Sequence, residues 1–244
     1  MPDPLQPKSA TGLDRRQVLS AAAGLAATLG ISASAISPAF AAAKPRRSQL
    51  VGPFDSFRDY IKALDERGLL LRVARLDQDQ YELAALTYRL IDEFGWYGAP
   101  AVLVEEIKQD GRWMKGPVIT NHQGHWDTEA IIWGKEPVPG DGPATYREVF
   151  NYLYDKMESS KGKPASIPTR LVTRDSAPVK EIVLRGDDIN LLDFAFIKSN
   201  PGDSARYVNT GSVFTEDTEL GMNFGTYRCE IKGPRRLGVN PEDG

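Results

Sequence analysis

The residues best suited to chemistry lie in one short segment, Asn223 to Arg228. An asparagine amide oxygen can coordinate a hard cation, and an arginine guanidinium can hold a carboxylate through two parallel hydrogen bonds. Gly225, inside the same segment, indicates a β-bulge or a ligand that approaches the backbone closely. The segment could therefore bind a metal ion and a carboxylate.

This segment is predicted to belong to a β-hairpin. Strands are expected over 207–215 and 222–231, joined by an acidic turn over 216–221. Because alternate residues of a strand share a face, we expect two groups on opposite sides: Asn223, Gly225 and Tyr227 on one, and Phe224, Thr226 and Arg228 on the other. On this chemistry alone, a hairpin with an ordinary surface arginine and an asparagine near the turn is the favoured interpretation.

Other polar residues are weaker candidates for a functional site. His122 and His125 are the only histidines, and no further histidine is available to complete a metal site, so they are expected in a loop after a strand. The acidic side chains of Glu216, Asp217 and Glu219 are expected to form a solvated turn rather than an acid–base pair.

The N-terminal segment has the layout of a secretory signal. Arg15 and Arg16 precede an apolar run over 18–36, and residues 39–41 (Ala-Phe-Ala) supply a small-x-small cleavage site. The arginine pair followed by an apolar residue and leucine indicates the twin-arginine type. We expect cleavage near Ala42, export to the periplasm and no stable membrane span afterwards. A permanent anchor is the alternative, since the run is nearly long enough to span a bilayer.

Length and charge limit the function classes. Cleavage would leave roughly 200 residues, enough for one large or two small domains. The first 41 residues hold three basic and two acidic side chains, so the mature part would carry about −3 − (+1) = −4. This argues against nucleic acid as a partner, because neutralising phosphates needs a basic surface. Cys229 is the only cysteine, which excludes an intramolecular disulfide, and we expect its side chain to face a packed side.

Two domains are expected after a flexible lead-in over 42–54. Helix and strand patterns alternate over 55–135, which predicts a small α/β domain. Its predicted elements are a helix capped by Asp55 and ended by Gly68, helices over 81–94 and 127–133, and strands over 69–73, 101–104 and 117–120. Residues 136–168 are expected to form a linker and an amphipathic helix marked by Tyr146, Val149, Phe150, Leu153 and Met157.

The pattern changes after Pro168, where residues 169–244 are expected to begin an all-β unit. Its predicted strands are 171–173, 179–184, 207–215 and 222–231. Few residues remain for a closed barrel, so the pattern suggests a truncated chain or one half of a complex.

Four segments together resemble the UbiD family of prenylated-flavin-dependent decarboxylases. They are Asn190-Leu191-Leu192, the loop from Asn200 to Tyr207, Thr210-Gly211, and Asn223 to Arg228, with Leu237-Gly238 also fitting. Residues 57–133, with a strand leading into Asn121 and Gly124, resemble the family's N-terminal domain. The resemblance is strongest over 182–238.

The resemblance implies an α+β fold, in which an α/β N-terminal domain precedes the start of a split β-barrel that binds flavin. It implies reversible, non-oxidative decarboxylation of an aromatic or α,β-unsaturated carboxylic acid on prenylated FMN. Asn223 would bind Mn²⁺ or Mg²⁺, with K⁺ as a further candidate ion. Phe224, Gly225, Thr226, Tyr227 and Arg228 would run along the cofactor, and Arg228 would also contact the substrate carboxylate.

The sequence departs from the family pattern at its end. The family's metal-binding histidine is expected just past Gly244, and its metal-binding glutamate, acid–base glutamates and C-terminal domain lie further on. The enzyme is therefore expected to be incomplete as given, with a homo-oligomer or a partner chain supplying the rest. The alternatives are a non-catalytic subunit that binds a partner chain and flavin without turnover, and an unrelated exported β-rich binding protein.

Overall fold

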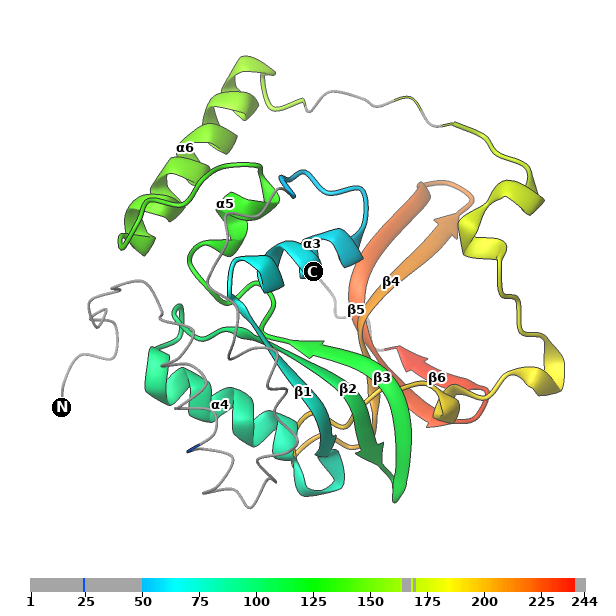
Figure 1. The fold of residues 1–244 in the computed structure, drawn as a ribbon. Coiled ribbons are helices and arrows are strands. Elements are labelled where there is room, and N and C mark those ends of the chain that lie inside the picture. The colour runs from blue at the N-terminus through cyan, green and yellow to red at the C-terminus, as the bar shows by residue number, and fades with distance from the viewer. Residues whose placement is uncertain (1–23, 25–49, 164–167, 169, 240–244) are drawn as a thin grey trace. The chain divides into compact units, whose positions relative to one another are not determined.

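The computed structural model describes residues 24, 50–163, 168 and 170–239 (Figure 1). The chain divides into two compact units between residues 165 and 166. The predicted signal segment, apart from Gly24, lies outside the described residues, as does most of the lead-in over 42–54. Among the helices of the described ranges, none combines the length and apolar character needed to cross a membrane.

The first unit is built around a three-stranded sheet. Its elements are α3 (Phe57–Glu66), β1 (Leu70–Asp77), the 3₁₀ turn η2 (Gln78–Gln80), α4 (Glu82–Phe94), β2 (Ala101–Gln109), β3 (Arg112–Thr120), α5 (Thr128–Ile132) and α6 (Gly142–Ser159). The strand order is β1-β2-β3, with β1 parallel to β2 and β2 antiparallel to β3. The predicted helix and strand alternation is confirmed, and each strand is longer than predicted.

Helices cover both faces of this sheet (Figure 1). Tyr60 and Leu64 of α3 and Ile131 of α5 pack with Leu70 and Leu103 in one buried cluster. Strand alternation points the next residues of β1 and β2 to the opposite face, where α4 buries its leucine stripe: Leu83, Leu86 and Leu90. The β1-α4-β2 crossover thus follows from two apolar strands joined by an amphipathic helix.

The start of α3 differs from the prediction by one residue. Ser56, not Asp55, is the N-cap: its hydroxyl oxygen accepts from the Asp59 amide at 3.1 Å, and the same hydroxyl donates to the Asp59 carboxylate at 2.8 Å. This reciprocal pair satisfies an amide that the first helical turn leaves unbonded. Both flanking residue types suit a cap, so the sequence alone did not separate them.

The second unit contains an open antiparallel sheet. Its strands are β4 (Tyr207–Asp217), β5 (Gly221–Gly233) and β6 (Arg236–Val239), in the order β4-β5-β6. The short 3₁₀ turns η3 (Arg174–Ser176), η4 (Pro178–Lys180), η5 (Gly186–Asp188) and η6 (Leu191–Asp193) precede it. The hairpin prediction is confirmed, whereas β6 was not predicted as a strand because it is only four residues long.

The predicted strands over 171–173 and 179–184 are wrong. These residues form irregular backbone and 3₁₀ turns, and Leu171 is 96% exposed. Their apolar composition resembles that of a strand, but a strand needs a neighbour that accepts its backbone hydrogen bonds. Among the described residues, neither segment pairs with another strand.

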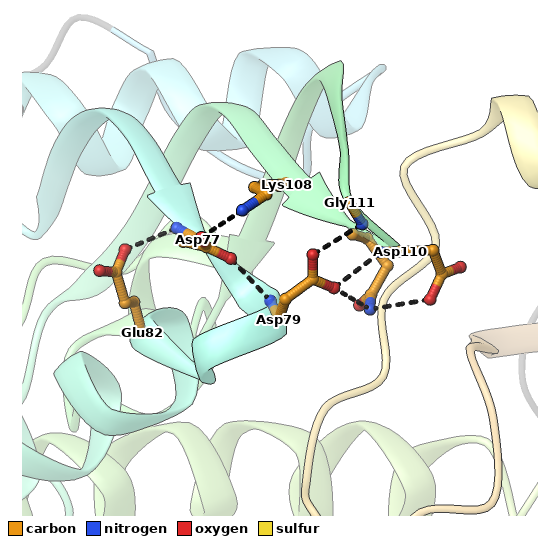
Figure 2. A network of polar contacts seen from close by, with 7 residues as sticks. Asp77, Asp79, Glu82, Lys108, Asp110 and Gly111 are labelled. Atoms are coloured by element: carbon orange, nitrogen blue, oxygen red, sulfur yellow. Dashed lines mark hydrogen bonds and ion pairs between the residues drawn. The ribbon is translucent and has the colours of Figure 1, made fainter.

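A network of carboxylates ties η2 to the β2–β3 turn (Figure 2). Asp79 accepts from the amides of Asp110 and Gly111, each at 2.7 Å, and from the Gln109 side chain at 3.1 Å. Asp77 accepts from Lys108 Nζ at 2.8 Å. The network therefore holds the β2–β3 turn against η2.

Replacing Asp79 with alanine is expected to destabilise the first unit by roughly 1–2 kcal/mol, because two turn amides lose a charged acceptor. Thermal unfolding followed by circular dichroism would measure the change. Asp92→Ala is the control, since Asp92 is an exposed aspartate of α4 in a long contact with Arg89. An Asp79→Ala variant that unfolds together with the control and the unmodified protein would contradict the role given to this carboxylate.

Candidate functional site

The segment from Asn223 to Arg228 lies on β5, opposite β4. Asn223 pairs with Thr215 and Gly225 with Val213 in a regular register. Of the two interpretations offered for Gly225, the bulge is therefore not observed, since the register shift of this strand pair lies between Val208 and Gly211.

The space above Gly225 is filled by an aromatic ring of the same strand. A Cβ atom at Gly225 would come within 2.5 Å of the Tyr227 ring. The ring therefore lies over the glycine, which confirms that these two residues share a face. Any larger residue at this position would displace Tyr227.

Arg228 is held by three neighbours. Its Nη2 donates to Asp203 Oδ1 at 3.1 Å, and its Nε donates to Asn209 Oδ1 at 3.1 Å. The guanidinium carbon lies 4.1 Å from the centre of the Tyr207 ring, a distance typical of a cation–π contact. Asp203 is itself oriented, since its second oxygen accepts from the Asn200 amide at 3.0 Å.

The held guanidinium keeps a donor edge available. Its side chain is 49% exposed, and Nη1 has no hydrogen-bond partner within the part of the chain that the structure describes. A planar cation that is fixed on one edge and open on the other can bind an anionic group in a defined orientation. Sequence analysis assigned no role to Asp203, Tyr207 or Asn209. The signal that was available is that Tyr207 and Asn209 alternate on β4 and so share a face.

A buried arginine supports the loop that carries Asp203. Arg206 is 5% exposed and donates to the carbonyl oxygens of Phe196 at 2.7 Å, Phe194 at 2.5 Å and Leu192 at 3.3 Å. These bonds fasten the segment before β4 to the start of that strand. Cys229 is buried as expected, and a Cβ atom at Gly211 would lie 2.7 Å from its sulfur.

Asn223 is an exposed residue near the hairpin tip, and strand alternation places it on the face opposite Arg228. Its amide oxygen is a chemically suitable metal ligand. Within the described ranges, no group of three or more His, Cys, Asp or Glu side chains gathers to hold a metal ion. The residues present thus fit one ligand of the expected metal centre, and the metal role of Asn223 stays a prediction.

Comparison with known proteins connects this site to a family. Residues 170–242 match the family profile of the UbiD 3-octaprenyl-4-hydroxybenzoate carboxy-lyase Rift-related domain. The chain is also 29% identical over 192 residues to a phenolic acid decarboxylase of Sedimentibacter hydroxybenzoicus, and 30% identical over 200 residues to one of Escherichia coli O157:H7. The chain is therefore similar to a UbiD domain over residues 170–242, and to phenolic acid decarboxylases over most of its length.

Solved structures give the same relationship. The vanillic acid decarboxylase ShVdcCD of Sedimentibacter hydroxybenzoicus, in open form, matches with a TM-score of 0.61 at 28% identity, over 76% of this chain. An evolved dimeric form of the UbiD-class enzyme HmfF from Pelotomaculum thermopropionicum, in complex with prFMN, matches with a TM-score of 0.58 at 26% identity, over 78% of this chain.

The match covers a minor part of each relative. The chain spans 36% and 37% of the lengths of the two phenolic acid decarboxylases, and 37% and 39% of the solved ShVdcCD and HmfF chains. The profile match includes the segments that hold Asp203, Asn209 and Arg228. The cofactor and catalytic roles expected for residues 223–228 stay predictions.

The two histidines of the first unit lie in different environments. The His122 ring packs edge-on against Phe57, with 5.2 Å between ring centres. Its Nδ1 is buried and has no hydrogen-bond partner among the residues that the structure describes. His125 Nδ1 accepts from the Asp127 amide at 3.1 Å, just before α5. Burial lowers the pKa of both imidazoles, and for His125 the nearby Asp127 carboxylate opposes that shift. As expected, both lie in the loop after a strand.

The buried imidazole of His122 predicts a pH-dependent stability. Its pKa lies below the ordinary value of 6.5 in the folded protein, so the unfolded chain takes up a proton first as the pH falls. The contribution of the neutral imidazole to the free energy of unfolding is fully present above pH 6.5. It is lost as the pH falls further, at up to about 1.4 kcal/mol per pH unit for one proton. Unfolding measured at pH 7.5 and 5.5 is expected to show a smaller loss in His122→Gln than in the unmodified protein. Equal losses would contradict this assignment.

The acidic turn of the hairpin is solvated, as predicted. Asp217 Oδ1 accepts from the amides of Glu219 at 2.8 Å and Leu220 at 2.9 Å. These backbone hydrogen bonds lower the pKa of the Asp217 carboxyl. The carboxylate therefore closes the turn, which leaves Arg228 and its neighbours as the candidate site of this unit.

Proposed function

We propose that this chain is the N-terminal portion of a UbiD-type carboxy-lyase that decarboxylates an aromatic or α,β-unsaturated carboxylic acid without oxidation, using prenylated FMN. The observation that carries the proposal is the Arg228 guanidinium, which is fixed by Asp203 and Asn209 and open on its remaining edge. The similarity to phenolic acid decarboxylases and to a UbiD-class enzyme in complex with prFMN supports the substrate class and the cofactor.

The residues of this chain would bind and orient the reactants. Arg228 would hold the substrate carboxylate beside the flavin, and its contacts with Asp203, Asn209 and Tyr207 would restrict its rotamers before substrate arrives. Restriction of this kind lowers the entropic cost of reaching the reactive geometry. Asn223 would contribute one oxygen ligand to Mn²⁺ or Mg²⁺, with K⁺ as a further candidate. Prenylated FMN, when bound, supplies the electron sink that allows carbon dioxide to leave.

The remaining catalytic groups would come from outside this sequence. We propose that further UbiD-type sequence, or a partner chain, supplies the acid–base glutamates. A solved structure of ShVdcCD with truncated ShVdcD, which matches with a TM-score of 0.61, is a precedent for a partner chain. We also propose that the protein is exported to the periplasm by the twin-arginine signal, a route for folded proteins that suits an enzyme loaded with its cofactor before export.

Carbon dioxide release tests this proposal. The protein would be produced with a flavin prenyltransferase and its natural partner chains, and incubated with a panel of phenolic and cinnamic-type acids. Release that depends on both the flavin and the acid is the expected result. A protein that binds flavin but releases no carbon dioxide from any of these acids would indicate the non-catalytic subunit instead. Absence of flavin binding would favour an unrelated exported binding protein.

A further inference from the structure

Helix α6 carries an apolar stripe that faces solvent. Tyr146, Phe150 and Met157 are each about half exposed, and Phe150 is 57% exposed. Together with the partly buried Leu153 they follow a 4-3-4 spacing, the spacing of the contact positions along a helix that packs on another helix. Tyr154 lies beside this seam and stacks on Phe150, with 6.3 Å between ring centres.

This seam is distinct from the side of α6 that packs on its own unit. The buried residues of the helix are Gly142, Thr145 and Val149, all in its first half. With 100° of rotation per residue, the mean direction of these buried side chains lies about a quarter turn around the helix axis from that of the seam. The amphipathic helix predicted from sequence is therefore confirmed, but of the five residues that marked it only Val149 is fully buried. The exposed positions are too large and too regularly spaced to be scattered surface residues.

We propose that the α6 seam pairs with the same seam of a second copy of this chain, with the two helices antiparallel. In this arrangement Tyr146 of one copy lies opposite Met157 of the other, and Phe150 lies opposite Leu153. Each contact occurs twice about the twofold axis, which gives a closed, self-complementary interface. The four large apolar side chains of the seam in each copy would be buried from solvent.

The charges beside the seam favour the antiparallel pairing. Arg147 and Glu158 lie on the same flank of the seam, near opposite ends of α6. Neither forms an ion pair with another described residue. In the antiparallel pair Arg147 of each copy would reach Glu158 of the second copy, across the Tyr154 ring. A parallel pair would place Arg147 of one copy and Glu158 of the other on opposite flanks of the seam, so this contact would not form.

The oligomeric state of the purified protein tests this interface. Sedimentation equilibrium is expected to show a reversible dimer, and Phe150→Glu is expected to weaken it on the order of 100-fold, because a carboxylate would enter an apolar seam twice per dimer. Tyr88→Glu is the matched control, since Tyr88 is an exposed aromatic residue of α4 away from the seam. An unmodified protein that stays monomeric, or a Phe150→Glu variant that dimerises like the control, would overturn the proposal.

Charge reversal identifies the occupant of the seam. Arg147→Glu alone and Glu158→Arg alone are each expected to weaken the dimer roughly tenfold, since each change creates two like-charge contacts per dimer. The double variant restores the opposite charges across the axis and is expected to recover most of the affinity. Circular dichroism would verify that α6 stays helical in each variant. If the double variant instead weakens the dimer by the product of the two single effects, something other than an antiparallel copy covers the seam.

Discussion

Replacing Arg228 with lysine is expected to lower kcat/KM for decarboxylation by about 100-fold or more in the cofactor-loaded protein with its full catalytic set. Lysine keeps the positive charge but loses the planar fork that reaches Asp203 and Asn209 together. It also loses the stacking of a flat cation on the Tyr207 ring. Steady-state carbon dioxide release measures the effect, and the flavin spectrum of the same sample shows whether the cofactor is still bound.

A second arginine of the same unit gives the matched control. Arg235 forms an exposed ion pair with Asp187, and Arg235→Lys is expected to leave kcat/KM unchanged. Asp203→Asn is expected to give an intermediate loss, since an amide oxygen can still accept the hydrogen bond but no longer carries the charge. Wild-type kcat/KM in Arg228→Lys would show that this guanidinium takes no part in the reaction.

Replacing Leu64 with alanine is expected to destabilise the first unit by about 2–5 kcal/mol. Leu64 is fully buried, in the cluster formed by α3, α5 and one face of the sheet. Truncation removes apolar contacts and leaves a cavity, because the surrounding strands and helices relax only in part. Urea unfolding followed by circular dichroism at 222 nm measures the change at the transition of the first unit.

Lys62→Ala, on the exposed side of the same helix, is the control for this substitution. It is expected to change the stability by less than about 0.5 kcal/mol. A Leu64→Ala variant that unfolds within that margin of the unmodified protein would mean that α3 does not pack on the sheet as described.

The first unit could be predicted closely because its signals are local. The spacing of the apolar residues predicts the secondary structure of α4, β1 and β2 without reference to other parts of the chain. Gly95 ends α4 with a positive φ of 82°. The predicted strands were too short because each extends beyond its apolar run at one end. In β1 the extension includes Arg75, which forms an ion pair with Glu106 of the next strand. Such pairs are visible only once the register is known.

The candidate site was predicted only in part because its contacts are not local. Arg228 was identified from residue type and family resemblance, but Asp203 lies 25 positions earlier and Asn209 lies 19 positions earlier. The irregular register between Val208 and Gly211 decides which side chains of β4 meet Arg228. The segments over 171–173 and 179–184 failed for a related reason, since apolar composition does not specify a pairing partner.

The intact mass, ultraviolet–visible spectrum and metal content of the protein purified from its native host test the central claim most directly. The account predicts a flavin absorbance band with bound Mn²⁺ or Mg²⁺, in a longer chain or a tight complex that supplies the remaining UbiD-type residues, and it predicts that Asn223→Ala loses the metal. A protein with the mass of this chain, no flavin absorbance and no metal would contradict it, and would indicate a binding subunit in which Arg228 serves only the fold.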